Sequence, residues 1–338
     1  MKRRQGYIRA KLLKKRGWKI GKNVYIGKGV VIKCKNLVIE DDCFILDNVF
    51  IDCPEIILKR NTIIFSNCYF KVKKNLVLGE RSKISRNCIF KGQSIVGERD
   101  LWCNENVEVG GGGWNSPKAN LYIGPFQHIG KNVHINVCEE VRLKGFSGIG
   151  MDCMIFTHGA GQGQSVFKGY SLTEGPVYIG QHVSINSRVI VAPDSIINDG
   201  CCVGASAYVS GELSSNGLYV GIPARYKKDI IELTDEMKKT IIVKHFGLKE
   251  DQKNAYSGIY YNSRITFYNL NEIILEKNGC HQVVIDINAS TIKGIAYEDS
   301  EKIRDEFRRM GEILIPSDGY IFAKLDPFVF LERGIEVE

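Results

Sequence analysis

Aliphatic side chains recur along most of the chain with a period of six residues. The first run of these positions is Ile20, Ile26, Ile32, Ile39, Ile45, Ile51, Leu58, Ile64, Phe70, Leu78, Ile84, Phe90, Val96 and Trp102. The period resumes at Ile123, Ile129, Ile135, Leu143, Ile149, Ile155, Ile179, Ile185, Val191, Ile197 and Val203. Six matches neither the 3.6-residue period of a helix nor the two-residue alternation of a long strand. Short strands joined by tight corners fit it, and stacking such coils into a parallel β-helix buries the aliphatic row.

A second, smaller side chain follows many of these aliphatic positions four residues later. The row consists of Val24, Val30, Cys43, Val49, Thr62, Cys68, Ser82, Cys88, Val133, Cys153, Val183, Val189 and Cys201. We expect it also to point inward, into an interior that is too narrow for large groups. Free cysteine behaves as a small hydrophobic residue, and no CxxC pair occurs to suggest zinc. Most of the 11 cysteines are therefore predicted to be reduced core residues.

Two segments interrupt the period. Residues 109–120 include four consecutive glycines, and residues 158–176 begin with His158 and end at a proline. Neither segment matches the hexad pattern, so we expect both to be loops expelled from the β-helix. In so regular a scaffold, expelled loops are where functional residues are expected.

The N-terminal segment 1–19 predicts a short basic amphipathic helix. Tyr7, Ile8, Leu12 and Leu13 stand at near-helical spacing among basic residues, and no acidic residue precedes position 40. Two interpretations stay open. The helix either covers the open edge of the first coil or attaches to an anionic membrane surface.

The remainder of the chain predicts a β-helix domain followed by a smaller domain. The hexads define the β-helix over residues 20–228, and a helix capped by Thr234 predicts a helical linker over 229–248. Residues 249–338 combine short apolar runs with a charged helix near Asp299–Met310, which indicates a small α+β domain of unknown role. Its turns are expected at Asn278-Gly279 and Asp318-Gly319.

Composition and charge narrow the class of protein. The 338 residues are 44% hydrophobic and 25% charged, with 35 glycines and 8 prolines, which excludes wholesale disorder, collagen and coiled coil. The sequence lacks both an apolar run of the roughly 20 residues that a membrane span needs and a signal peptide, so we expect a cytoplasmic protein. The net charge is +8. No stacking motif accompanies it, so no nucleic-acid partner is predicted.

The hexads, the loop beginning Phe156-Thr-His-Gly and the segment 176–228 together resemble the left-handed β-helix acyltransferases. The nearest likeness is to sugar and polysaccharide O-acetyltransferases related to maltose and galactoside acetyltransferase. The matching motifs are Pro176-Val-Tyr-Ile-Gly180, Val203-Gly-Ala-Ser-Ala-Tyr-Val209 and Gly221-Ile-Pro-Ala-Arg225. The resemblance covers residues 20–228. It implies an all-β main domain, a left-handed parallel β-helix, with acetyl-CoA as donor, a carbohydrate acceptor and a homotrimer whose active sites lie between subunits.

By this resemblance His158 is the general base. An ordinary imidazole, with a pKa near 6.5, can take the proton of an acceptor hydroxyl as that hydroxyl attacks a thioester. A base needs an orienting partner, and Glu139 or Glu140 is expected to hold the imidazole, with Glu140 preferred. Asn136 occupies a family-like position, and His134 falls where a family member carries an acceptor-binding Asn, so the resemblance implies that both bind the acceptor.

The same resemblance implies binding residues for both substrates. Trp114 and Tyr170, one in each expelled loop, are expected to stack on a sugar ring, with the two loops meeting across a subunit interface. Coenzyme A is expected to lie along the prism, with its phosphates on cations. Its predicted contacts are Ser187, Gly204, Ala205, Ser206, Arg225, Lys227 and Lys228.

The predicted function is therefore acetyl-CoA-dependent O-acetylation of a sugar or a surface polysaccharide, without a metal. N-acetylation of an amino sugar is the first alternative, since the same base serves an amine. A gamma-class carbonic anhydrase shares the fold and needs three histidines on zinc, for which His128, His134, His158 and His182 are candidates. A non-catalytic β-helix scaffold is the third alternative.

Overall fold

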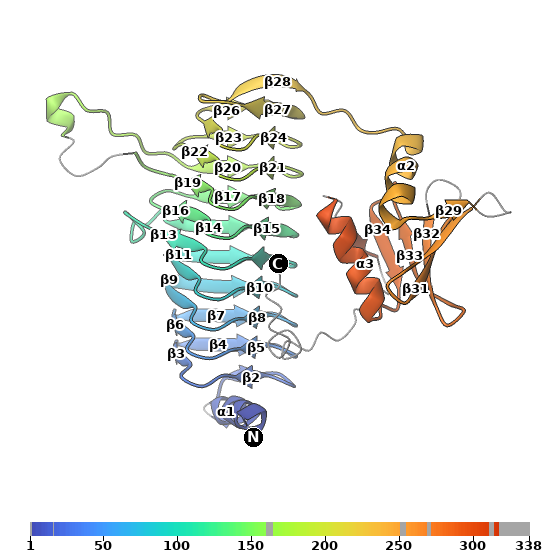
Figure 1. Cartoon of the computed structure of the whole chain (residues 1–338). Helices are drawn as coiled ribbons and strands as arrows, with labels where there is room; N and C mark the ends of the chain where they lie inside the picture. The colour runs from blue at the N-terminus through green and yellow to red at the C-terminus, as the bar shows by residue number, and fades with distance from the viewer. Residues whose placement is uncertain are drawn as a thin grey trace. The chain divides into compact units, whose positions relative to one another are not determined.

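The computed structural model describes residues 2–15, 17–159, 165–250, 255–268, 272–310 and 314–317. These residues form two compact units that divide between Ile230 and Ile231. The first is a stack of parallel coils, which Figure 1 shows from β2 at one end to β28 at the other. The predicted parallel β-helix of hexapeptide repeats is confirmed.

Each coil contributes one short strand to each of three faces of a prism. Face 1 consists of β3 (Val31–Lys33), β6 (Phe50–Asp52), the first parts of β9 (Tyr69–Leu78) and β11 (Ile89–Gly97), β13 (Glu108–Gly110), β16 (His134–Asn136), β19 (Met154–Ile155), β22 (Ile190–Val191) and β25 (Tyr208–Val209). Face 2 consists of β1 (Lys19–Ile20), β4 (Asn36–Ile39), β7 (Glu55–Leu58), the second parts of β9 and β11, β14 (Asn120–Ile123), β17 (Val141–Leu143), β20 (Val177–Ile179), β23 (Ile196–Ile197) and β26 (Glu212–Leu213). Face 3 consists of β2 (Tyr25–Ile26), β5 (Phe44–Ile45), β8 (Ile63–Ile64), β10 (Lys83–Ile84), β12 (Trp102–Cys103), β15 (Gln127–Ile129), β18 (Ser147–Ile149), β21 (Ser184–Ile185), β24 (Cys202–Val203) and β27 (Gly217–Val220), with β28 (Arg225–Asp229) antiparallel at its end.

Both predicted rows of inward residues are found in the core of this unit. The aliphatic row includes Ile45, Ile64 and Phe70, all fully buried, and each such side chain stabilises the fold by roughly 1.5–3 kcal/mol. Cys43 and Cys88 of the second row are equally buried, and the cysteines are free thiols. The interpretation of these cysteines as core residues is confirmed.

The predicted phase fails at one place. Val96 and Trp102 were expected inward, but both point outward, and Ile95 and Cys103 are buried instead. The cause lies in the corner where β11 bends from face 1 to face 2 without a break. The inward positions Phe90 and Gly97 are seven residues apart across this corner, whereas the predicted row allowed six. The extra residue moves the inward row by one position.

Polar side chains join successive coils at the corners. Asn48, Asn67, Asn87 and Asn106 occupy equivalent left-handed positions with φ of 59–63°, and their amides bond from coil to coil at 3.3–3.4 Å. Asparagine is suited to this conformation because its side chain bonds locally.

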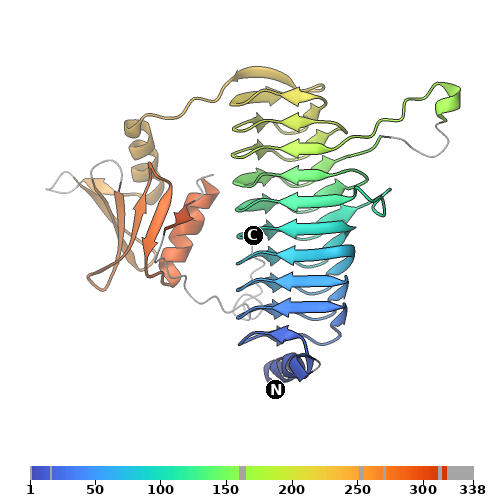
Figure 2. The same ribbon diagram turned by 180° about the vertical axis from the view of Figure 1, so that it is seen from behind.

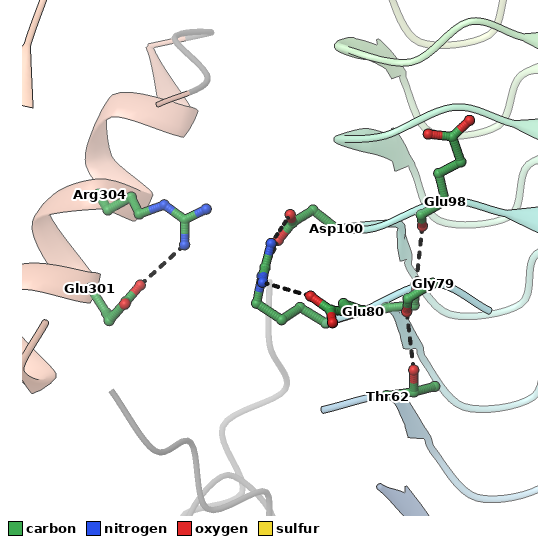
Figure 3. Close-up of polar contacts among 9 residues, drawn as sticks. Thr62, Gly79, Glu80, Glu98, Asp100, Glu301 and Arg304 are labelled. Carbon is green, nitrogen blue, oxygen red and sulfur yellow. Dashed lines mark hydrogen bonds and ion pairs between the residues drawn. The ribbon is translucent and has the colours of Figure 1, made fainter. Parts of the chain in front are cut away.

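Another corner carries a partly buried ion pair. Arg81 donates to both carboxylate oxygens of Asp100, at 2.9 and 2.6 Å, and the Thr62 hydroxyl donates to the Gly79 carbonyl at 3.1 Å; Figure 3 shows Asp100, Thr62 and Gly79 at these corners. The bidentate geometry fixes the spacing of neighbouring coils.

Helix α1 (Lys2–Lys15) covers the first coil. Ala10 enters the core, Tyr7 packs edge-on against Tyr25, and the Arg9 guanidinium donates to the Ile26 carbonyl at 2.8 Å. One side of this helix therefore covers the open edge of the first coil, as the first of the two interpretations expects. Ile8 and Leu12 on its other side are exposed.

The second unit is a mainly antiparallel sheet packed with two helices, seen from behind in Figure 2. Its elements are α2 (Asp235–Phe246), β29 (Lys249–Glu250), β30 (Tyr256–Tyr260), β31 (Ser263–Tyr268), β32 (Glu272–Lys277), β33 (Cys280–Asp286), β34 (Thr291–Gly294), α3 (Glu298–Arg309) and β35 (Ile315–Pro316). The Asn278-Gly279 turn joins β32 to β33, with both residues at positive φ, whereas the turn expected at Asp318-Gly319 lies outside the described residues.

Helix α2 is part of this second core. Its Thr234 cap accepts from Met237 N as the sequence predicts, but Ile242 and Phe246 are buried against the sheet and Phe307 of α3. The helix expected in a linker thus contributes to the fold of the second unit.

Candidate active site

His158 stands at the root of the second expelled loop, three residues beyond β19. The loop closes here, because Gly159 N donates to Thr173 O at 2.7 Å and Gly175 N donates to Thr157 O at 3.1 Å. Beyond this root the chain runs out past the short helix η1 (Val166–Lys168), as Figure 1 shows. Thr157 is fully buried and His158 is half-buried. The coil therefore holds the imidazole at the edge of face 1, open on one side.

Asn136, at the end of β16 one coil earlier, is buried in a dense hydrogen-bond network. Its Nδ2 donates to the carbonyls of Gly110 and Gly112 at 3.1 and 2.8 Å. Its Oδ1 accepts from the backbone N–H groups of Thr157 and Cys138 at 3.3 and 3.4 Å. Because backbone donors and acceptors cannot exchange roles, they fix which end of this amide is oxygen.

The Oδ1 atom of Asn136 also lies 2.8 Å from Nδ1 of His158. An amide oxygen only accepts, so Nδ1 of His158 must carry the proton and donate it. The neutral imidazole then presents its lone pair at Nε2, the atom that a general base uses. The network thus orients the ring and selects its tautomer.

The glycine-rich loop packs directly on this pair. A Cβ added at Gly112 would stand 3.1 Å from Nε2 of His158, and one added at Gly111 would stand 3.0 Å from Nδ2 of Asn136. A Cβ added at Gly113 would stand 2.5 Å from Sγ of Cys138, so a larger residue fits there only if Cys138 is displaced. The first expelled loop therefore packs on His158, at the root of the second, within one chain.

The expected role of Glu140 needs correction. The Glu140 carboxylate pairs with Arg142 at 3.0 Å, and Glu139 pairs with Lys118 at 2.9 Å. Cations thus engage both carboxylates at the corner after β16, whereas Asn136 bonds to the carbonyls of the glycine-rich loop. The residue that holds the imidazole of His158 is Asn136, which the sequence suggested only as a substrate contact.

His134 lies on face 1 beside this pair. Its Nδ1 is 3.7 Å from the Glu108 carboxylate, its ring packs on Phe156, and a Cβ at Gly111 would stand 3.3 Å from its Nε2. The ring is partly exposed. His134 is therefore well placed to contact an acceptor that reaches His158.

The two aromatic residues expected to hold a sugar ring have different surroundings. Trp114 is half-buried, with the ammonium groups of Lys71 and Lys73 at 5.8 and 5.5 Å from its ring centroid. Tyr170 is exposed and lies in the second loop just after η1. Trp114 is thus part of a basic surface together with Lys71 and Lys73.

The residues expected to bind coenzyme A lie at the opposite edge of face 1 from His158. Ser187 and Ser206 occupy stacked corners, where Ser206 N donates to Ser187 O at 3.0 Å. Gly204 and Ala205 complete the upper corner, and Ala205 and Ser206 are exposed. This surface of small residues leaves room for an extended amide chain.

The expected phosphate-binding cations lie just beyond that corner. Strand β28, which pairs with β27, carries Arg225, Lys227 and Lys228, all exposed. Cations on an open edge suit phosphate groups. The small corner and the cations therefore fit a nucleotide that carries an amide-linked arm.

The thiol of Cys138 is the other reactive group near the loop. Burial, followed by the nearby Glu174 and Glu139 carboxylates, raises its pKa above the usual thiol value. The thiol is therefore neutral at physiological pH and is a poor nucleophile.

The histidines expected for a zinc site are dispersed. His134 and His158 share the site above, but His128 lies on face 3 against Trp102, and His182 stacks on Phe146. Among the residues that the structure describes, no group of three or more His, Cys, Asp or Glu side chains could hold a metal ion.

No protein-family model matches this chain, but known acyltransferases are similar to parts of it. The dTDP-4-amino-4,6-dideoxy-D-glucose acyltransferase of Escherichia coli is 34% identical over 76 residues, which are 21% of this chain and 40% of that protein. The galactoside O-acetyltransferase of Escherichia coli K12 is 26% identical over 146 residues, 41% of this chain and 69% of that protein. The chain is similar to sugar acyltransferases. The resemblance inferred from the hexads is confirmed at this level.

Solved structures with related folds are more distant. A UDP-N-acetylglucosamine acyltransferase from Campylobacter jejuni gives a TM-score of 0.47 at 12% identity, over 66% of this chain and 83% of that one. AntD, an N-acyltransferase from Bacillus cereus in complex with dTDP and 3-hydroxybutyryl-CoA, gives 0.33 at 17% identity, over 70% and 95%.

Proposed function

We propose that this protein is an acetyl-CoA-dependent O-acetyltransferase that modifies a hydroxyl of a sugar or a surface polysaccharide. One observation carries the proposal: the bond from Nδ1 of His158 to the buried Oδ1 of Asn136, which leaves Nε2 as the available base. The similarity to a galactoside O-acetyltransferase supports the same chemistry.

In the proposed reaction, Nε2 of His158 takes the proton of the acceptor hydroxyl as the oxygen attacks the acyl carbon. The thioester supplies that carbon and a thiolate leaving group. Asn136 keeps the Nδ1 proton in place, so the imidazolium stays oriented and returns the Nε2 proton to the departing sulfur. General-base assistance of this kind is worth roughly 10²–10⁴-fold in rate.

Labelled acetyl-CoA, incubated with a panel of acceptors, tests the proposal. The panel contains neutral and acidic glycans, and amino nucleotide sugars, because one relative acts on an amino sugar. We expect label in an alkali-labile ester of a glycan. Label in an alkali-stable amide would show that the protein transfers acetyl to nitrogen and not to oxygen. If the protein neither transfers acetyl nor binds CoA, the scaffold alternative is favoured.

We further propose that the protein is a homotrimer. Face 1 exposes an apolar row near His158, in which Met154, Ile190 and Tyr208 stand in register on neighbouring coils and are 43%, 37% and 37% exposed. Contiguous apolar surface of this kind is usually covered by another chain. Face 1 of a neighbouring copy would complete the acceptor site.

Contact with an anionic membrane is proposed for α1. Among the residues that the structure describes, no helix is long and apolar enough to cross a membrane. Ile8 and Leu12 are exposed beside the basic residues Lys11 and Lys14, which suits peripheral binding. Co-sedimentation with phosphatidylserine vesicles should be lost in an Ile8→Glu, Leu12→Glu variant.

A further inference from the structure

Face 1 changes character along its length. Its coils beyond His158 are apolar, whereas the coils before it carry lysines beside aromatic rings. We call Lys71, Lys73, Lys91 and Trp114 the basic track. Its strands, β9 and β11, belong to the same face as β19, which leads to His158.

The basic track is a preformed cluster. Lys71 and Lys73 hold their ammonium groups 5.8 and 5.5 Å from the centroid of Trp114, and Lys91 stands 5.9 Å from that of Tyr69. Cation–π contacts of this kind fix the amines without neutralising them. None of the three lysines forms an ion pair with another described residue. Three unneutralised cations thus converge on one surface.

Acidic groups on the same face do not cancel this charge. Asp52 lies in register between Lys33 and Lys71, so it faces a cation on both sides. Glu108 lies beside His134, at 3.7 Å. The part of face 1 before the glycine loop is therefore basic overall, and it suits an anionic ligand.

The glycine loop connects the basic track to His158. Gly112 lies beside the imidazole, so that an added Cβ would stand 3.1 Å from its Nε2, and two residues later Trp114 reaches the lysines. Gln93 holds the loop by donating to Asn115 O at 3.1 Å. One loop thus touches both ends of a single surface.

The separation along the prism sets the size of the ligand. Lys91 lies three coils before β19 and Lys71 lies four. Because coils repeat every ~4.8 Å, the strands that carry these lysines lie roughly 14–19 Å from the level of β19. A nucleotide sugar carries its phosphates directly on the reacting sugar, which is too close. A chain of several sugars spans the distance.

We propose that the basic track binds acidic groups of an extended carbohydrate chain whose reacting residue lies at His158. This inference rests on the proposed acetyl transfer, and it names the acceptor class as an anionic polysaccharide. The chain lies along face 1, its acidic groups pair with Lys71, Lys73 and Lys91, and Trp114 lies against a ring between them.

Binding of defined oligosaccharides, measured by calorimetry without acetyl-CoA, tests this inference. The probes are hexagalacturonate, galacturonate, uncharged maltohexaose and UDP-glucose. The test variant replaces Lys71, Lys73 and Lys91 by Gln. The control replaces Lys19, Lys22 and Lys144 by Gln, which removes the same charge from β1 and from the corners after β1 and β17.

We expect hexagalacturonate to bind more tightly than the other three probes. The test variant should bind it about tenfold more weakly, since each exposed ion pair contributes a few tenths to 1 kcal/mol, and the control should bind as wild type does. Equal affinity of wild type and test variant overturns the inference. So does an equal loss in the control, or lysine-dependent binding of UDP-glucose as tight as that of the hexamer. If the hexamer binds through these lysines but no acceptor is acetylated, the proposed function is wrong and the inference about the binding surface still holds.

Discussion

Replacing Gly112 with alanine places a methyl group next to Nε2 of His158, the atom proposed as the base. The added Cβ would stand 3.1 Å from Nε2 and 3.3 Å from Cε1 of His158. A hydroxyl that gives its proton to Nε2 must approach within 2.6–3.2 Å of it. The methyl group therefore occupies the place of the acceptor oxygen. The substitution blocks the base without removing it.

The size of the effect follows from what the base contributes. Loss of general-base assistance costs roughly 10²–10⁴-fold in turnover, which is about 3–5 kcal/mol at the barrier. The cost in stability should be small, about 0.5 kcal/mol, because Gly112 is exposed and its neighbours need to move only slightly. Chemistry and folding should therefore separate.

The assay is the rate of CoA release with saturating acceptor, beside a thermal melt of each variant. Gly148→Ala is the matched control, since Gly148 lies in β18 of the same β-helix and an added Cβ meets nothing within 4 Å. We expect the control to keep wild-type turnover. If Gly112→Ala retains more than about a tenth of wild-type turnover against the general-base range, Nε2 of His158 is not the base.

Three further predictions concern the same unit. Asn136→Ala should lower turnover by roughly 10²-fold through misplacement of the imidazole, yet change nothing further in a His158→Ala background; additive losses in a double-mutant cycle would contradict the pairing. Burial raises the pKa of Cys43 to about 12, so the folded thiol stays protonated where the unfolded thiol ionises. The free energy of unfolding in urea should therefore fall between about pH 9 and 11 in wild type. In Cys43→Ala it should fall less steeply, by up to ~1.4 kcal/mol per pH unit. Equal slopes in the two proteins would refute the assignment. Sedimentation equilibrium should give a trimer of 38.0 kDa chains that Ile190→Glu dissociates, and an active monomer would exclude a shared site.

The fold could be predicted largely from local pattern. Each inward residue such as Ile64 or Phe70 recurs at a fixed spacing, because every coil repeats the same corners. The prediction failed at Val96 and Trp102, because the corner from Phe90 to Gly97 spans seven residues and the row was continued at six. Earlier coils show the same longer corner, from Ile32 to Ile39 and from Ile51 to Leu58, so the sequence carried a signal for this slip.

The candidate site was predictable only in part. The expelled loop and the resemblance pointed to His158, but its partner lies 22 residues earlier. One coil back from His158 the chain offers Asn136, Cys138, Glu139 and Glu140, and charge favoured a glutamate. The structure shows that the partner of His158 is the buried Asn136 and not a charged residue. Which of these side chains is buried depends on the path of the chain at the corner.

The run of glycines is also visible in the sequence, but the sequence does not show what these glycines contact. Four glycines from Gly110 indicate a close approach of backbone to something, and the structure supplies His158 and Asn136 as the partners. The basic track could not be predicted, because Lys71 and Trp114 are distant in sequence and meet only through the coil stack.

The rate of single-turnover acetyl transfer in wild type and His158→Ala tests the central claim most directly. If His158 is the base, the variant lacks general-base assistance and should be roughly 10²–10⁴-fold slower. Its coenzyme A affinity and its thermal transition should stay unchanged. A variant that keeps the wild-type rate would contradict the account, and the base would then have to be sought at His134.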